Sequence, residues 1–328
     1  MPARRSLVFS ALAVPLFAAT LAVAPCASAQ KAPTKVSFRL DWKPGANQAP
    51  FFYARDRGYY AQEGIDLQII PGSGSSDSVK QVGSKAVDLA LVDALVLVQA
   101  LEQRVPVKAV AAYFQRSPIV LVSLKAKPIT DPKQLLGDVK VGVKKGSATF
   151  QGLAAMLSAN NIQLEQLKMV DVGFSIQPLL VKQVDAMMDV TMDGPVAAEA
   201  AGMPVQELFI ADHGVNTYGL TIASNNDFIR SKPELISAFL RATRKAVQES
   251  AGAKQAVIQA MAKSADGIDV ARELKGFDRT LTFLTAPGVE FGTQSEARWQ
   301  QNVDTAKRLG LVEKPPAAKD LFVTGLLK

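Results

Sequence analysis

Three groups of side chains in this sequence have chemistry suited to holding a small organic molecule. Aromatic rings that can stack on a flat ring system occur at Trp42, Tyr113, Phe174 and Tyr218. Carboxylates that accept hydrogen bonds from ring NH or amino groups occur at Asp41, Asp93, Asp189 and Asp193. Side chains that donate or accept occur at Asn47, Gln48, Ser73, Ser147 and Thr149. Aromatic rings combined with carboxylates favour a neutral or cationic heterocycle over a bare anion.

Most of these side chains fall in loops that follow predicted strands. In open α/β sheets, ligands bind beyond the carboxyl ends of the strands, where helix N-termini offer free N–H groups and a partial positive charge. The loops chosen by this rule are 41–48, 71–77, 92–93, 113–116, 146–149, 173–177 and 189–193. A small ligand is expected to lie among them.

Each candidate also has a purely structural interpretation. A single aromatic residue more often belongs to the core than to a ligand site, and a single Asp is more often a helix cap or a solvated residue. Ser75, Ser76 and Asp77 are expected to be caps. The stretch Gly72-Ser73-Gly74 lacks both the GxGxxG spacing and the P-loop lysine, so it does not predict a nucleotide site.

Catalytic and metal-binding patterns are absent from the sequence. His213 is the single histidine and Cys26 the single cysteine, which leaves no Cys–His pair and no histidine-rich metal site after export. We therefore expect no enzyme, no metal and no cofactor. The formal net charge is +7, and no basic run is interleaved with aromatic residues, so nucleic-acid binding is not expected.

The N-terminus has the features of a secretory signal peptide. Arg4 and Arg5 precede an apolar stretch over 7–23, and small residues at 27–29 follow it. The prediction is a signal peptide over 1–29, cleavage after Ala29 and a periplasmic mature protein. The alternatives are a retained membrane anchor and a lipoprotein modified at Cys26.

The elements that must position the candidate residues alternate between strand and helix. Apolar alternation and short buried runs predict strands over 36–40, 65–70, 89–92, 107–113, 140–143, 167–172, 186–190 and 218–224. Helices are predicted over 49–57, 78–86, 93–103, 150–160, 195–201 and 233–250. Gly58 is expected to close the first helix. This alternation is typical of a mostly parallel sheet flanked by helices.

The pattern occurs twice, which predicts two similar lobes. The order of elements that follows 79–82 (Val-Lys-Gln-Val) recurs after 181–184, which has the same four residues. We predict an α/β, type II-like periplasmic-binding-protein fold. Its lobe 1 would consist of 30–124 and 219–328, and its lobe 2 of 125–218. Two crossings between the lobes are expected near 122–126 and 216–221, which would allow the lobes to hinge.

Several blocks of the sequence resemble the thiamine-precursor family, which includes bacterial importer receptors and a fungal pyrimidine synthase. The opening block is the most specific and comprises Asp41-Trp42-Lys43-Pro44 with residues 51–60 and 63–66. Residues 83–88, 218–240 and 309–312 also resemble family segments. The resemblance covers nearly all of the chain beyond the leader and implies the two-lobed fold.

The resemblance implies a receptor rather than an enzyme. The positions that correspond to the lysine and histidine of the synthase branch hold Val92 and Val96, and 212–219 lacks that branch's cysteines. The implied function is the periplasmic binding component of an ABC importer, acting as a monomer with an inner-membrane permease and its ATPase. A thiamine pyrimidine precursor is the favoured ligand. A sulfonate, nitrate or an aromatic acid is the alternative, since the family's opening loop often carries Asn and His where Asn47 and Gln48 stand here.

Overall fold

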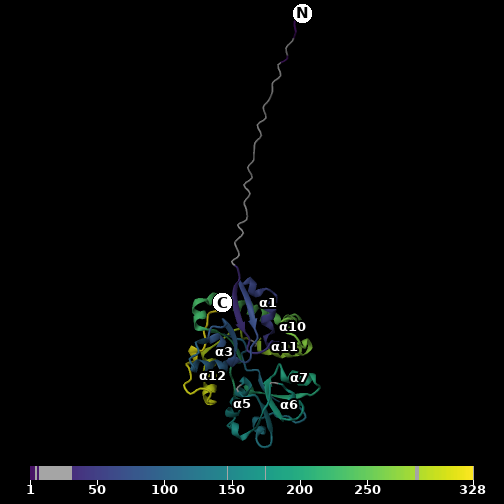
Figure 1. The fold of residues 1–328 in the computed structure, drawn as a ribbon, viewed down its shortest axis with the longest axis vertical. Helices are drawn as coiled ribbons and strands as arrows, with labels where there is room; N and C mark the ends of the chain where they lie inside the picture. Colours follow the sequence, from purple (N-terminus) through teal and green to yellow (C-terminus); the bar gives the residue numbers. More distant parts are fainter. Residues whose placement is uncertain (4–5, 7–31, 146, 174, 285–287, 328) are drawn as a thin grey trace. The chain divides into compact units, whose positions relative to one another are not determined.

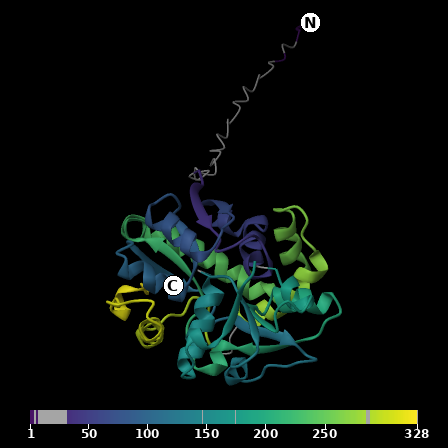
Figure 2. The same cartoon turned by 60° about the horizontal axis from the view of Figure 1, so that its bottom comes forward.

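The computed structural model describes residues 1–3, 6, 32–145, 147–173, 175–284 and 288–327. Contacts within the chain divide it into Met1–Ala32 and Pro33–Lys328, and the fold described here is that of the second unit (Figures 1 and 2). The leader lies almost wholly outside the described residues, as do Cys26 and Phe174. Cleavage after Ala29 therefore stays a prediction. Among the helices that the structure describes, none is both long enough and apolar enough to cross a membrane.

Ten strands form two five-stranded sheets in the described part of the chain. The first sheet has the order β2-β1-β3-β10-β4, and the second has the order β7-β6-β8-β5-β9. The strands of the first are β1 (Thr34–Arg39), β2 (Ile65–Ile70), β3 (Leu89–Asp93), β4 (Val107–Ala112) and β10 (Leu220–Asn225). Those of the second are β5 (Ile119–Leu124), β6 (Lys140–Val143), β7 (Lys168–Asp171), β8 (Ala186–Val190) and β9 (Val205–Phe209).

The two sheets share one pairing pattern. In the first sheet β1 pairs parallel with β2 and β3, whereas β10 pairs antiparallel with β3 and β4. In the second sheet β6 pairs parallel with β7 and β8, whereas β5 pairs antiparallel with β8 and β9. Each sheet therefore has a single antiparallel strand, and that strand is the one that arrives from the other sheet. The prediction of two similar, mostly parallel lobes is confirmed.

The crossings between the sheets lie at 113–118, between β4 and β5, and at 210–219, between β9 and β10. The second agrees with the expected position, but the first crossing was wrongly expected at 122–126. Residues 119–124 form an uninterrupted buried strand, and the polar stretch 115–117 with Pro118 makes the change of sheet. Apart from the limit at this first crossing, the predicted lobe limits 30–124, 125–218 and 219–328 stay predictions.

Helices cover both sheets. They include α1 (Ala49–Asp56), α3 (Ser75–Gly83), α4 (Ala94–Glu102), α5 (Ala148–Ala159), α7 (Gly194–Ala200), α9 (Pro233–Ser250), α11 (Val270–Leu284) and α12 (Glu296–Arg308). Shorter or outer helices are α2 (Tyr59–Gln62), α6 (Gln177–Leu180), α8 (Asn226–Ser231) and α10 (Lys254–Ala262). Single 3-10 turns are η1 (Ala46–Gln48), η2 (Pro132–Leu135), η3 (Leu164–Gln166), η4 (Ile210–His213) and η5 (Ala318–Asp320).

The start of α3 differs from the prediction. The helix begins at Ser75, so Ser75 to Asp77 lie in its first turn instead of capping a later start. Gly74 precedes the helix with φ +126°, a conformation that L side chains rarely adopt. Because glycine tolerates this conformation, the chain can turn into the helix at Ser75, three residues earlier than predicted. Asp77 instead forms an ion pair with Arg39 of β1. Gly58 closes α1 with φ 72°, as predicted.

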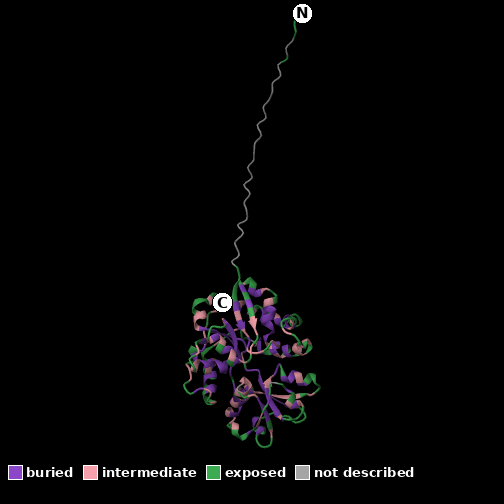
Figure 3. Ribbon diagram, viewed as in Figure 1, coloured by how far each residue is buried: buried purple, intermediate pink, exposed green. Residues whose placement is uncertain are grey.

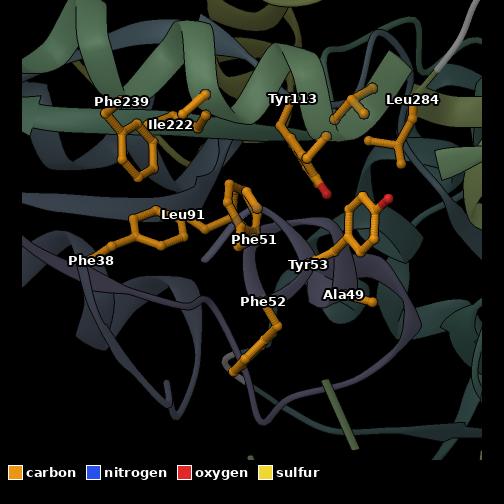
Figure 4. Close-up of a cluster of buried hydrophobic side chains, with 14 of the residues drawn as sticks. Phe38, Ala49, Phe51, Phe52, Tyr53, Leu91, Tyr113, Ile222, Phe239 and Leu284 are labelled. Atoms are coloured by element: carbon orange, nitrogen blue, oxygen red, sulfur yellow. The ribbon is translucent and has the colours of Figure 1, made fainter. Parts of the chain in front are cut away.

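An aromatic cluster forms the centre of the core around the first sheet. The Phe51 ring stacks on the Tyr113 ring at 4.9 Å between centroids and packs against Phe38 at 4.6 Å. Phe239 of the amphipathic helix α9 packs on Phe38 at 5.1 Å. Figure 4 shows these rings pointing toward one another, and Figure 3 shows burial concentrated on the inner faces of the elements. The cluster gives the loops after β1 and β4 a rigid base.

Candidate ligand-binding cleft

A cavity of about 680 Å³ opens at the carboxyl ends of strands from both sheets. Its volume lies within the range of small-molecule sites. Predicted site residues from the first sheet's loops that line it are Asp41, Trp42, Asn47, Gln48, Ser73 and Asp93. Those from the second sheet's loops are Ser147, Thr149, Asp189 and Asp193. The structure thus brings these ten side chains to one cavity.

Two predicted site residues do not line the cavity. The Tyr113 ring stacks between the rings of Phe51 and Phe114, and its hydroxyl donates to the Asn47 carbonyl at 2.8 Å. The Tyr218 ring packs against Trp299 of α12 at 5.3 Å. Both tyrosines are almost fully buried. They support the cleft loops from behind, so stacking of a ligand on either ring was a wrong expectation. Phe174 lies outside the described residues.

The loop that follows β1 is held by the loop that follows β2. The Gly72 amide donates to the Trp42 carbonyl at 2.9 Å, and the Gly74 amide donates to the Asp41 carbonyl at 2.8 Å. A Cβ on Gly72 would lie 2.0 Å from the Leu40 carbonyl oxygen, so a side chain there would force the two loops apart. This close approach fixes the positions of Asp41 and Trp42 at the cleft.

Burial raises the pKa values of two carboxylates from the first sheet. Loss of water raises the pKa of Asp41 to about 6, although the hydrogen bond that Gln48 donates to it at 2.8 Å opposes the rise. Loss of water also raises the pKa of Asp93 to about 7. Asp93 is 8% exposed and accepts the Leu95 amide at 2.9 Å as the N-cap of α4. Each carboxylate would be stabilised in its charged form by a ligand that donates hydrogen bonds.

The second sheet contributes another pair of carboxylates. Burial, followed by the negative charge of Asp193, raises the pKa of Asp189 to about 8. A Cβ on Gly194 would lie 2.0 Å from an Asp189 carboxylate oxygen, so the glycine makes room for this side chain at the start of α7. The residue Asp193 is exposed as a whole, but neighbouring atoms exclude water from its carboxyl group, and this loss of water raises its pKa. The positive charge of Arg272 opposes the rise. A positively charged or donor-rich group would relieve the repulsion between these two carboxylates.

Helix α11 contributes cleft residues that were not predicted from the sequence. Arg272 and Glu273 line the cavity. A Glu273 carboxylate oxygen accepts the Ala46 amide at 2.7 Å, and the other oxygen pairs with Arg272 at 3.0 Å. Burial raises the pKa of Glu273, and its bond with Arg272 opposes that rise. Helix α11 begins more than 220 residues beyond the first cleft loop, and its only local signal is an amphipathic pattern.

The two positions at which the family resemblance puts the synthase's reactive residues hold buried aliphatic side chains here. Val92 lies in β3 at 0% exposure, and Val96 lines the cavity from α4. Within the described ranges, no group of three His, Cys, Asp or Glu side chains is arranged to hold a metal ion. The cavity presents carboxylates, an indole, amides and hydroxyls, together with the basic side chains of Lys43, Lys80, Lys144, Lys145 and Arg272.

Sequence comparison places the chain in a family. Residues 45–256, more than half of the sequence, match the family described as NMT1/THI5 like. The chain belongs to the NMT1/THI5-like family. This result confirms the resemblance drawn from the opening block.

Among curated relatives, the chain is 26% identical to the formylaminopyrimidine-binding protein of Halalkalibacterium halodurans, with 94% of this chain and 97% of that protein covered. It is 26% identical to the riboflavin-binding protein RibY of Chloroflexus aurantiacus, with 71% and 67% covered. A 4-amino-5-hydroxymethyl-2-methylpyrimidine phosphate synthase of Saccharomyces cerevisiae is 25% identical, with 65% and 66% covered. The relatives thus include both binding proteins and a synthase.

Comparison with solved structures bears on the fold. The periplasmic aliphatic sulphonate binding protein SsuA from Escherichia coli superposes with a TM-score of 0.71 at 14% identity, covering 89% of this chain and 93% of that one. The nitrate-binding protein NrtA from Synechocystis superposes with a TM-score of 0.67 at 14% identity, covering 88% and 84%. At this identity the likeness establishes the fold, which is that of periplasmic binding proteins.

Proposed function

We propose that this NMT1/THI5-like protein is the substrate-binding component of an ABC-type importer, and that it captures a small heterocyclic or aromatic solute in the cleft. The observation that carries the proposal is the cavity lined by residues of both sheets, with two crossings connecting them. Such an arrangement lets a ligand contact both lobes and favour their closure. A relative matched over nearly the full length of both chains is named as a binding protein.

The chemistry of the cleft favours a ring that carries hydrogen-bond donors. Asp41, Asp93 and Asp189 offer carboxyl groups whose raised pKa values let them accept from, or donate to, ring nitrogens and amino groups. Trp42 provides an indole that can stack on the ring. A thiamine pyrimidine precursor satisfies these requirements, and the relatives named for a formylaminopyrimidine and for riboflavin support a heterocycle.

We further propose that the protein is not an enzyme. Some relatives are named as synthases, so the case against an enzyme comes from the residues of this chain. Val92 and Val96 offer neither an amine nor an imidazole at the positions where the family resemblance puts the synthase's reactive groups. Incubation with pyridoxal phosphate tests the point. We expect no Schiff-base absorption, and a stoichiometric Schiff base on the native chain would contradict the proposal.

The proposed role has a location and partners. An exported, monomeric receptor would work outside the cytoplasm and deliver its ligand to an inner-membrane permease driven by an ATPase. The expected leader and the periplasmic proteins of the same fold support this location. Sequencing the N-terminus of the exported protein tests it. We expect the chain to start at Gln30, and an intact N-terminus in the cytoplasm would contradict it.

A thermal-shift screen, preceded by native mass spectrometry for co-purified ligand, tests the binding function. The compounds are aminopyrimidines, thiamine, riboflavin, aliphatic sulfonates, nitrate and aromatic acids. A ligand at 100 times its Kd stabilises the protein by about 2.7 kcal/mol, which gives a visible shift in Tm. We expect an aminopyrimidine to give the largest shift. If only a sulfonate, nitrate or an aromatic acid gives a shift, that compound replaces the pyrimidine as the proposed ligand. If no small solute binds, the receptor function is contradicted.

A further inference from the structure

One face of helix α11 lies along the loop that follows β8 of the second sheet. Arg272, Gly276 and Arg279 are spaced at i, i+4 and i+7, so they share that face of the helix. Arg279 contacts Thr191, Gly276 approaches Met192, and Arg272 lies near Asp193. Successive turns of the helix therefore lie beside successive residues of the segment 191–193, in the reverse order.

Arg279 makes most of the polar contacts of this interface. One guanidinium nitrogen donates to the Thr191 carbonyl at 2.9 Å and lies 3.1 Å from its hydroxyl oxygen. The same nitrogen pairs with Glu207 of β9, and the other terminal nitrogen pairs with Glu199 of α7 at 2.8 Å. Arg279 and Glu207 are both mostly buried, at 24% and 17% side-chain exposure. A planar guanidinium that binds three groups at once fixes their positions relative to one another, which a lysine ammonium does not.

Gly276 lets the helix come close to the loop. A Cβ at this position would lie 2.6 Å from the Met192 carbonyl oxygen and 3.2 Å from the Ala46 side chain. Because the first of these atoms is backbone, it could not move aside without shifting the loop. The glycine thus allows α11 to contact the cleft loops of both sheets, 46 from one and 192 from the other.

The opposite side of α11 is anchored in the core around the first sheet. Phe277 and Leu281 belong to the same buried cluster as Phe51 and Phe239. The helix therefore packs into the core around the first sheet, while Arg279 holds three groups attached to the second. Met192 and Asp193, which line the cavity, are part of the segment that it holds.

We propose that Arg279 is a positioning residue for the ligand cleft. It links the two lobes through Thr191, Glu199 and Glu207 and thereby sets the place of Met192 and Asp193 at the ligand. Arg279 does not line the cavity, so it acts on a ligand only through these residues. The link between the lobes stands independently of the proposed function, whereas its effect on a ligand rests on that function.

Distance measurement between the lobes tests the link without any ligand. Spin labels at Asp66→Cys in β2 and Glu165→Cys in η3, both exposed, report the separation of the lobes, with Cys26 changed to serine. We expect one narrow distance distribution for the parent chain and a broader, longer one for Arg279→Gln. Glu199→Gln, at an exposed partner, should change the distribution in the same direction and does not disturb the core.

Arg241 provides the matched control. It forms a bidentate pair with Glu63, at 2.6 and 3.1 Å, between α9 and the end of α2, both of which cover the first sheet. Arg241→Gln should lower stability without changing the distance distribution. The proposal is overturned if Arg279→Gln and Glu199→Gln give the parent distribution, or if Arg241→Gln changes it equally.

Binding of 4-amino-5-hydroxymethyl-2-methylpyrimidine provides the second readout. Loss of the link lowers the population of the binding-competent arrangement, so the apparent Kd should rise about tenfold in Arg279→Gln, mainly through faster dissociation. Arg241→Gln should keep the parent Kd. A changed distance distribution with no binding of this pyrimidine by the parent chain would support the link and contradict the proposed ligand, which separates the two claims. An unchanged Kd in Arg279→Gln would overturn the positioning role.

Discussion

Replacing Asp93 by Asn should reduce the dependence of protein stability on pH. The carboxyl of Asp93 has a pKa of about 7 in the folded protein, against an ordinary value of 3.8. Between these two values the folded chain holds a proton that the unfolded chain has released. Its contribution to stability is therefore complete below about pH 4 and is lost as the pH rises through about 7.

The size of this effect follows from one proton per molecule. Within the window the free energy of unfolding should fall by at most about 1.4 kcal/mol per pH unit through Asp93 alone. Asp41 and Asp189 also have raised pKa values and add slopes of the same sign. Comparison with Asp93→Asn isolates the contribution of one residue, and the Asn oxygen can still accept the Leu95 amide as the helix cap.

Urea unfolding at pH 4.5, 5.5, 6.5 and 8 measures the difference. We expect the wild-type free energy of unfolding to fall more steeply with pH than that of the variant up to about pH 7. Above pH 8 the two slopes should be equal. Parallel curves across the whole range would refute the reasoning that burial keeps Asp93 protonated. An Asp66→Asn variant, at an exposed position on β2, serves as the control.

Two substitutions test the architecture of the cleft. Gly72→Ala should cost about 2 kcal/mol or more and weaken ligand binding, because its Cβ would overlap the Leu40 carbonyl and displace the loop after β1; wild-type stability measured by urea unfolding would contradict this. Tyr218→Phe removes the oxygen that accepts the Ser295 amide at 3.1 Å and should cost about 1 kcal/mol with no change in ligand affinity. A weakened affinity in calorimetry would contradict the supporting role of this hydroxyl and place it at the ligand.

The arrangement of the cleft loops could be predicted because it depends on local pattern and on topology. Alternating residues such as Ile65 to Ile70 locate a strand from sequence alone, and β2 has these bounds. Parallel strands then bring their carboxyl ends to one edge of a sheet. These two rules account for ten candidate residues at one cavity.

The remaining features depend on contacts between distant parts of the chain. A buried aromatic ring such as Tyr113 or Tyr218 has the same local sequence whether it lines a cleft or supports it. Arg272 and Glu273 reach the cleft from an amphipathic helix whose docking position is set by tertiary packing. The first crossing was misplaced because an apolar run such as 119–124 fits either sheet. Local sequence carries no signal for these choices.

The most direct test of the account is calorimetry with the compound that gives the largest thermal shift. Trp42→Ala and Asp193→Ala each remove a side chain that lines the cleft from a different lobe. We expect both variants to lose at least about tenfold in affinity, because each removes a stacking surface or a charged hydrogen-bond partner. The exposed control Asp66→Ala should bind like the wild type. Unchanged affinity in both cleft variants would contradict the assignment of this cavity as the ligand-binding site.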